Sequence, residues 1–87
     1  MDNELFLNER VEVLAIFRTG YHPCQPVKFR RASGREVVIT KVGLGFPRQS
    51  GSKTVHVFDV TDGQADYRLE FDAFTLSWRL VREADRE

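Results

Sequence analysis

The chain has 87 residues, of which 41% are hydrophobic and 11% aromatic, with 13 basic and 13 acidic side chains and no net formal charge. This length fits a single domain with one hydrophobic core. No stretch approaches the ~20 apolar residues of a membrane span, and the acidic N-terminus lacks the apolar run of a signal peptide. The single cysteine, Cys24, cannot form an internal disulfide. We therefore expect a cytoplasmic protein.

Segments that alternate with period two, or that are rich in β-branched residues, predict an all-β domain. We expect about six mostly antiparallel strands in a barrel-like or strongly bent sheet. In chain order, the strands are predicted at residues 10–18, 27–31, 36–42, both arms of 54–72, and 76–82. Glycines and prolines predict irregular segments at 19–26 and 43–53. The whole chain, 1–87, is one domain whose ends, 1–9 and 83–87, are expected to fray.

The inward positions of these strands define an expected core. Its members are Val13, Phe17, Phe29, Val37, Ile39, Phe58, Val60, Tyr67, Leu69, Phe71, Trp78 and Leu80.

The clearest signal is a β-hairpin over residues 54–72, whose arms flank Asp62-Gly63. Asp-Gly favours a two-residue type I′ turn, in which both residues have positive φ. This turn places Phe58 opposite Tyr67 on the core face and Asp59 opposite Asp66 on the other. Two carboxylates directly across a ladder repel each other. We interpret the pair as exposed and relieved by a neighbouring arginine, with a cation site as the alternative.

The charges are unevenly distributed along the chain. Residues 10–53 are mostly basic, whereas residues 54–87 are mostly acidic. Neighbouring strands of opposite charge attract each other, and a bipolar surface can also bind an anion or another copy of the chain. The candidate nucleic-acid or anion site comprises Lys28, Arg30, Arg31, Arg35, Arg48 and Lys53, with Tyr21 and Phe46 as rings on which bases would stack.

Residues that often carry chemistry are few and poorly spaced. His22 and Cys24 lie two apart in a proline-containing loop, and His56 is distant in sequence. Zinc sites usually need four ligands, so we interpret Cys24 as a small packed residue and His56 as a residue at the edge of the core. The glycines at 43 and 45 lack the rest of a phosphate-binding loop. We therefore expect no enzyme, cofactor or metal.

Three segments resemble a group of small bacterial β domains. They are residues 26–42, beginning Pro26-Val-Lys-Phe-Arg-Arg, then Tyr67-Arg-Leu-Glu-Phe-Asp, and finally Trp78-Arg-Leu. The group pairs a proline-led strand and a Gly-Arg turn with a late Tyr-x-Leu-x-aromatic-Asp strand. It commonly has a tryptophan in the central loop, where this chain has Phe46. The resemblance implies the fold and no catalytic residue, because no activity is established for the group.

The expected function is a non-catalytic protein-interaction or self-association module. Residues 11–17 and 37–39 have apolar side chains on both faces, and a small domain has a thin stability margin, so a homodimer or a protein partner is expected. The alternative is weak binding of nucleic acid or another anion through the basic segment 28–53.

Overall fold

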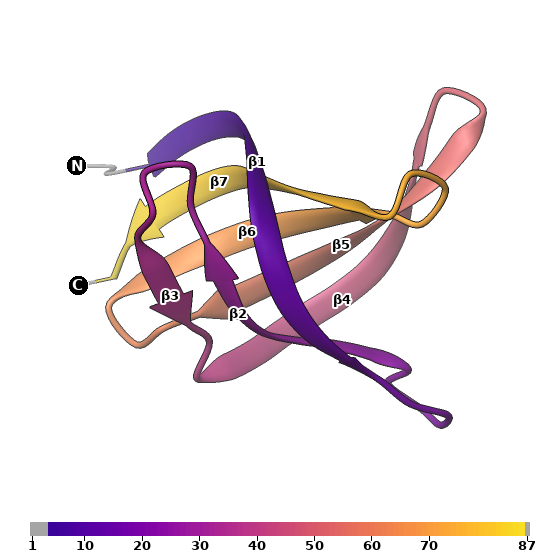
Figure 1. Cartoon of the computed structure of the whole chain (residues 1–87), viewed down its shortest axis with the longest axis horizontal. Coiled ribbons are helices and arrows are strands. Elements are labelled where there is room, and N and C mark those ends of the chain that lie inside the picture. Colours follow the sequence, from indigo (N-terminus) through magenta and orange to yellow (C-terminus); the bar gives the residue numbers. More distant parts are fainter. Residues whose placement is uncertain (1–3, 87) are drawn as a thin grey trace.

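A computed structural model describes residues 4–86, which form seven antiparallel strands in a single curled sheet (Figure 1). The strands are β1 (Glu4–Phe17), β2 (Cys24–Arg30), β3 (Glu36–Val38), β4 (Lys41–Ser50), β5 (Lys53–Thr61), β6 (Ala65–Asp72) and β7 (Ser77–Asp85). Their order across the sheet is β3-β2-β1-β7-β6-β5-β4. The all-β prediction is confirmed, with one strand more than expected.

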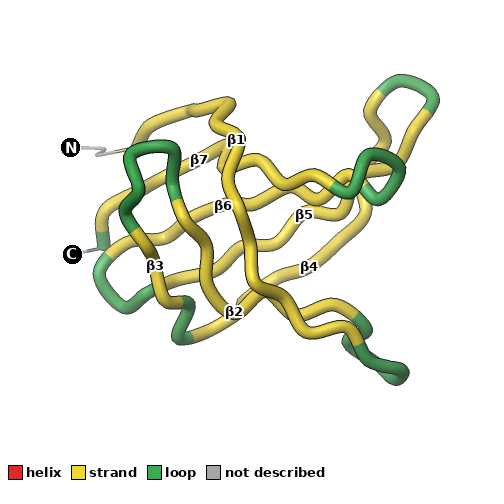
Figure 2. The backbone as a smooth tube through the Cα atoms, viewed as in Figure 1, coloured by secondary structure: helices red, strands yellow, loops and turns green. Residues whose placement is uncertain are grey.

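The two edge strands, β3 and β4, are consecutive in the chain and meet at one end of the half-barrel. The linker between them hydrogen-bonds to both sides of the curled sheet: Ile39 N donates to Val27 O of β2 at 2.9 Å, and Thr40 N donates to Thr61 O of β5 at 2.8 Å. Beyond this point the start of β2 and the rest of β4 diverge (Figure 2). The half-barrel is therefore closed at one end and open along one side at the other.

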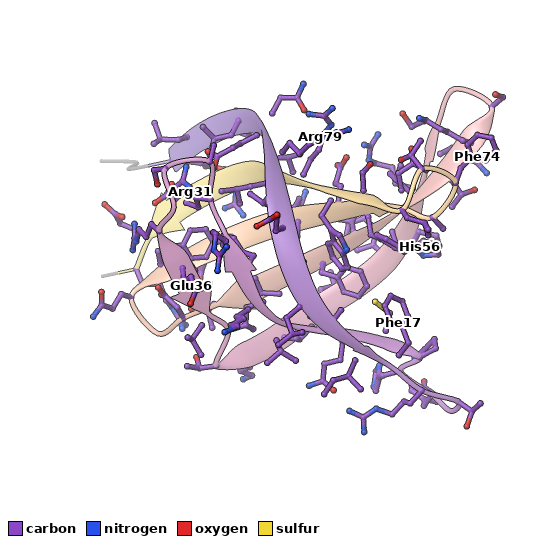
Figure 3. All side chains as sticks on the ribbon, viewed as in Figure 1. Phe17, Arg31, Glu36, His56, Phe74 and Arg79 are labelled. Carbon is purple, nitrogen blue, oxygen red and sulfur yellow. The ribbon has the colours of Figure 1, made fainter. Side chains whose placement is uncertain are left out.

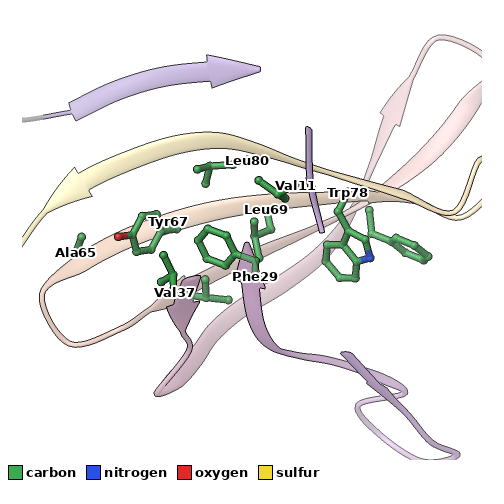
Figure 4. Packing of buried hydrophobic residues seen from close by; sticks show 10 residues of the cluster. Val11, Phe29, Val37, Ala65, Tyr67, Leu69, Trp78 and Leu80 are labelled. Atoms are coloured by element: carbon green, nitrogen blue, oxygen red, sulfur yellow. The ribbon is translucent and has the colours of Figure 1, made fainter. Parts of the chain in front are cut away.

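The concave face of the sheet holds the core (Figure 4). Its buried members are Val11, Phe29, Val37, Val60, Ala65, Tyr67, Leu69, Phe71, Trp78 and Leu80. Most of the expected core residues are confirmed, and Val13, Ile39 and Phe58 pack against this cluster partly buried. Phe17 differs, because its side chain is 64% exposed. The β1–β2 pairing shifts register between Leu14 and Ala15, and Phe17 lies beyond that irregularity at the end of the strand.

The convex face of the sheet has a buried layer of its own. Val55 and Val57 of β5 are 6% and 1% exposed, although neither belongs to the core cluster. Val57 lies between Phe46 and Glu70 in the ladder. Long charged side chains that keep their heads in water can cover such positions with their aliphatic stems.

The predicted irregular segment 43–53 is wrong, because most of it forms β4 and pairs with β5 up to Ser50 opposite Lys53. Proline is tolerated on an edge strand, which does not need every N–H group, and Pro47 occupies such a strand. Space does not require glycine at position 45, because the nearest contact of an added Cβ atom would be an ordinary van der Waals contact. A Cβ atom on Gly45 would lie 3.4 Å from the Phe58 ring.

The predicted hairpin is correct, but its register is wrong by two residues. Phe58 lies opposite Leu69, and Asp59 lies opposite Arg68 rather than Asp66. The reason is a longer turn in which Asp62 Oδ1 accepts hydrogen bonds from the backbone N–H groups of residues 64 and 65, each at 2.8 Å. Arg68 makes two hydrogen bonds to Asp59, at 2.7 and 3.0 Å, so the expected pair of facing carboxylates does not form.

The expected frayed ends differ from the structure. Residues 4–6 of β1 pair with residues 82–84 of β7, so both segments are part of the sheet. Residues 1–3 and 87, which the same expectation included, lie outside the described residues.

Replacing Gly63 with valine should lower the free energy of unfolding by about 1–3 kcal/mol, because a β-branched residue resists positive φ. Gly63 has φ of 96°, whereas Asp62 does not have the positive φ that a type I′ turn requires. Urea unfolding monitored by circular dichroism measures the loss. Gly63→Asn is the matched control, since asparagine tolerates this conformation. Equal losses in the two variants would contradict the conformational explanation.

Candidate functional site

The open side of the half-barrel contains a slot of about 380 Å³. It is lined by Phe17, Tyr21, His22, Pro23, Cys24, Gly45, Phe46, Pro47, His56, Phe58 and Phe71. One wall comes from the end of β1 and the start of β2, and the other comes from β4 and β5. None of these lining residues is Asp, Glu, Lys or Arg. We refer to this feature as the aromatic slot.

Aromatic rings that pack at tilted angles form the base of the aromatic slot. The Trp78 ring lies 4.7 Å from that of Phe71 and 5.7 Å from that of Phe58, measured between centroids. Phe17 extends this group toward solvent, with its centroid 6.1 Å from that of Phe71. Trp78 is buried and Phe17 is exposed, so the aromatic cluster continues from the core to the surface. A preformed apolar cavity of this kind is typical of binding sites.

The β1–β2 loop supplies the outer rim of the slot. Arg18 N donates a hydrogen bond to Pro23 O at 2.8 Å, which closes the loop, and Gly20 permits its turn with φ of 128°. Tyr21 at the tip is 93% exposed and packs edge-on against His22, with 5.0 Å between ring centroids. The loop therefore holds a large ring in water beside an apolar cavity.

The three residues considered for metal or thiol chemistry, His22, Cys24 and His56, all line the aromatic slot. Within residues 4–86, no group of three or more His, Cys, Asp or Glu side chains is arranged to hold a metal ion. Burial raises the pKa of the Cys24 thiol, which favours the protonated form over the thiolate that attacks substrates or binds metals. These residues therefore contribute to the wall of a cavity.

The β4 strand also exposes backbone groups along the open side. β4 is the last strand of the sheet and pairs only with β5. An edge strand presents unpaired N–H and C=O groups that another chain can hydrogen-bond. The aromatic slot and the free edge of β4 thus lie side by side.

The basic residues singled out from the sequence are distributed over the molecule and paired with acids. The ion pairs join Lys28 and Arg30 to Glu36, Arg31 to Glu9 and Glu83, Arg48 to Glu70, and Lys53 to Asp72. Of the six, only Arg35 has no such pair among the residues that the structure describes. Figure 3 shows Arg31 and Glu36 on the side of the molecule away from Phe17 and His56.

The two predicted stacking residues have different surroundings. Tyr21 lies on the exposed rim of the slot. Phe46 is half-buried, and the Arg68 guanidinium lies 5.7 Å from its ring centroid, so one face of this ring is already occupied. Because Phe46 pairs with Val57, its ring lies with Arg68 on the convex face, so of the two rings only that of Tyr21 lies at the slot.

Sequence reasoning missed the slot, because its walls come from segments that only the fold brings together. It had assigned Phe17, Phe58 and Phe71 to the core, and Phe46 and Pro47 to a loop. The density of aromatic residues at residues 17–22 was the one available signal.

The structure contains no helix within residues 4–86 that could act as a membrane span. Comparisons of the chain with models of protein families, with curated proteins and with solved structures find no match. Function is therefore inferred from the geometry of the aromatic slot.

Proposed function

We propose that this domain is a non-catalytic protein-interaction module whose binding surface is the aromatic slot. The observation that carries the proposal is an uncharged cavity of about 380 Å³ that opens beside the free edge of β4. Aromatic residues in a pocket contribute much of the affinity of protein interfaces, because they bury a large area at a small entropic cost. The free edge adds backbone hydrogen bonds to a partner strand.

The pairing of the basic residues supports protein binding over nucleic-acid binding. A phosphate-binding surface needs positive side chains that are free and close together. Lys28 and Arg30 share Glu36, and Arg31 lies between two carboxylates with only 16% of its side chain exposed. A phosphate would have to displace these carboxylates. Alternating signs on one surface are typical of a solvated sheet face.

Two measurements on ¹⁵N-labelled protein test the proposal. One follows the amide spectrum as protein concentration rises to about 1 mM, at which a dimer with a Kd of ~1 mM is substantially populated. The other follows the amide spectrum as peptides are added. These peptides are first selected from a random phage-displayed library for binding to the immobilised domain. We expect chemical-shift changes at slot residues such as His56 and Gly45 in at least one of the two.

Phe17→Arg should abolish this binding, because it places a charge at the mouth of the slot. Phe6→Arg is the matched control, since Phe6 is also an exposed β1 residue, at 79%, and does not line the slot. Binding that survives Phe17→Arg, or shifts confined to the convex face, would contradict the proposal. If the wild-type domain bound a labelled oligonucleotide at low salt and Arg35→Glu lost that binding, the result would favour the nucleic-acid alternative.

A further inference from the structure

The turn between β6 and β7 exposes two large apolar side chains beside the slot. Phe74 is 87% exposed and Leu76 is 76% exposed. Phe71 lines the slot, and Phe74 follows it by only three residues. Figure 3 shows Phe74, His56 and Phe17 along the same side of the molecule. We call residues 74–76 the apolar knob.

The conformation of the knob is strained and held in place. Leu76 has φ of 56°, and it is the only non-glycine residue with positive φ among those that the structure describes. A bulky residue in this region is an outlier, and such strain persists where the surrounding structure imposes it. Asp72 Oδ1 holds the first part of the turn by accepting hydrogen bonds from Phe74 N at 2.9 Å and Thr75 N at 3.3 Å. Leu76 is the last residue of the turn that joins Asp72 to its partner Ser77, and a residue with positive φ commonly completes a short hairpin turn.

We infer that the slot binds the apolar knob of a second copy of this chain. This inference rests on the proposed function and names the partner. Knob and slot both lack Asp, Glu, Lys and Arg side chains, so neither has to bury a charge. The chain has no net charge to oppose self-association. Because knob and slot lie at one end of the molecule, a two-fold axis between them allows each copy to fill the other's slot.

The available area indicates a weak dimer. Phe17, Tyr21 and Phe74 are exposed aromatic residues at this end, and such a side chain can bury ~150–250 Å². Together with Leu76 they would bury on the order of 500 Å² per copy. A standard interface buries about 800 Å² per partner, so we expect a Kd in the micromolar to millimolar range.

Sedimentation velocity on mixtures of variants tests the inference. Phe74→Ser removes the knob and Phe17→Arg disables the slot, and each should weaken self-association at least about tenfold. An equimolar mixture of the two variants should associate more strongly than either alone, because one intact knob can still enter one intact slot. Phe6→Ser is the matched control and should leave the wild-type Kd unchanged, since it removes an equally exposed ring outside the site.

Each result has a defined meaning once amide spectra show that the variants are folded. Complementation in the mixture supports knob-in-slot binding. Leu76→Asn provides a second knob variant that tolerates positive φ, and it should also weaken association. Loss of self-association in Phe17→Arg but not in Phe74→Ser overturns the inference while the proposed function stands. No self-association at about 1 mM also overturns it, and peptide selection then tests the slot separately. Association unaffected by either variant argues against both.

Discussion

Replacing Arg31 with alanine should lower the free energy of unfolding by about 3 kcal/mol, as expected when one partner of a poorly solvated ion pair is removed. Arg31 donates two hydrogen bonds to Glu9, at 2.8 and 3.2 Å, and one to Glu83 at 2.8 Å. Its side chain is only 16% exposed. The variant would leave two carboxylates close together with no cation between them. Urea unfolding at neutral pH measures the loss.

Arg35→Ala is the matched control for Arg31. Arg35 lies in the same turn, is exposed and has no ion pair among the described residues, so its replacement should change stability by less than about 0.5 kcal/mol. Equal losses in the two variants would contradict a structural role specific to Arg31. A large loss in Arg31→Ala alone would also show that this residue cannot be used to probe phosphate binding without unfolding the domain.

The Arg31 effect should depend on pH in a defined direction. The hydrogen bonds from Arg31 hold the pKa of Glu9 below its ordinary value of 4.5. A carboxyl group with a lowered pKa in the folded state stabilises the fold above its unfolded pKa, and this contribution is lost as pH falls through the folded pKa. The difference between wild type and Arg31→Ala should therefore shrink on acidification below pH 4.5. A difference that grows at acid pH would contradict the assignment.

Period-two alternation predicted which β6 residues face the core, and this prediction is confirmed. In β6, Ala65, Tyr67, Leu69 and Phe71 are all buried. The hairpin register was wrong by two residues, and a shift of two leaves every side chain on the same face. Alternation therefore cannot distinguish the two registers. The side-chain hydrogen bonds of Asp62 lengthen the turn and make the choice.

Edge strands and long-range ion pairs were beyond sequence reasoning for a different reason. The β4 segment contains Gly43, Gly45 and Pro47, and it becomes a strand because β5 pairs with it. Local propensity carries little information at an edge that depends on tertiary pairing. Similarly, Arg31 is 22 residues from Glu9 and 52 from Glu83. The apparent basic segment is neutralised by acids that the sheet topology brings to it.

Replacing Trp78 with alanine should lower the free energy of unfolding by about 3–5 kcal/mol, as for other large aromatic residues in cores. The Trp78 side chain is buried and its ring packs on Phe71 and Phe58. A domain of this size has a total stability of roughly 4–13 kcal/mol, so the variant should be close to its unfolding threshold. Chemical unfolding monitored by far-ultraviolet circular dichroism measures the loss. Tryptophan fluorescence cannot follow the unfolding of this variant, because Trp78 is the only tryptophan in the chain.

Phe74→Ala separates the fold from the binding surface. Phe74 is 87% exposed, so its loss should change stability by less than about 0.5 kcal/mol, although the ring is as large a hydrophobic group as many in the core. Trp78→Phe should retain part of the packing and fall between wild type and Trp78→Ala. If Phe74→Ala destabilised the monomer as strongly as Trp78→Ala, the turn would be part of the core and could not serve as a knob. A stable Phe74→Ala monomer would instead mean that the exposed ring does not stabilise the fold. The inference that this ring binds a second copy of the chain requires that result.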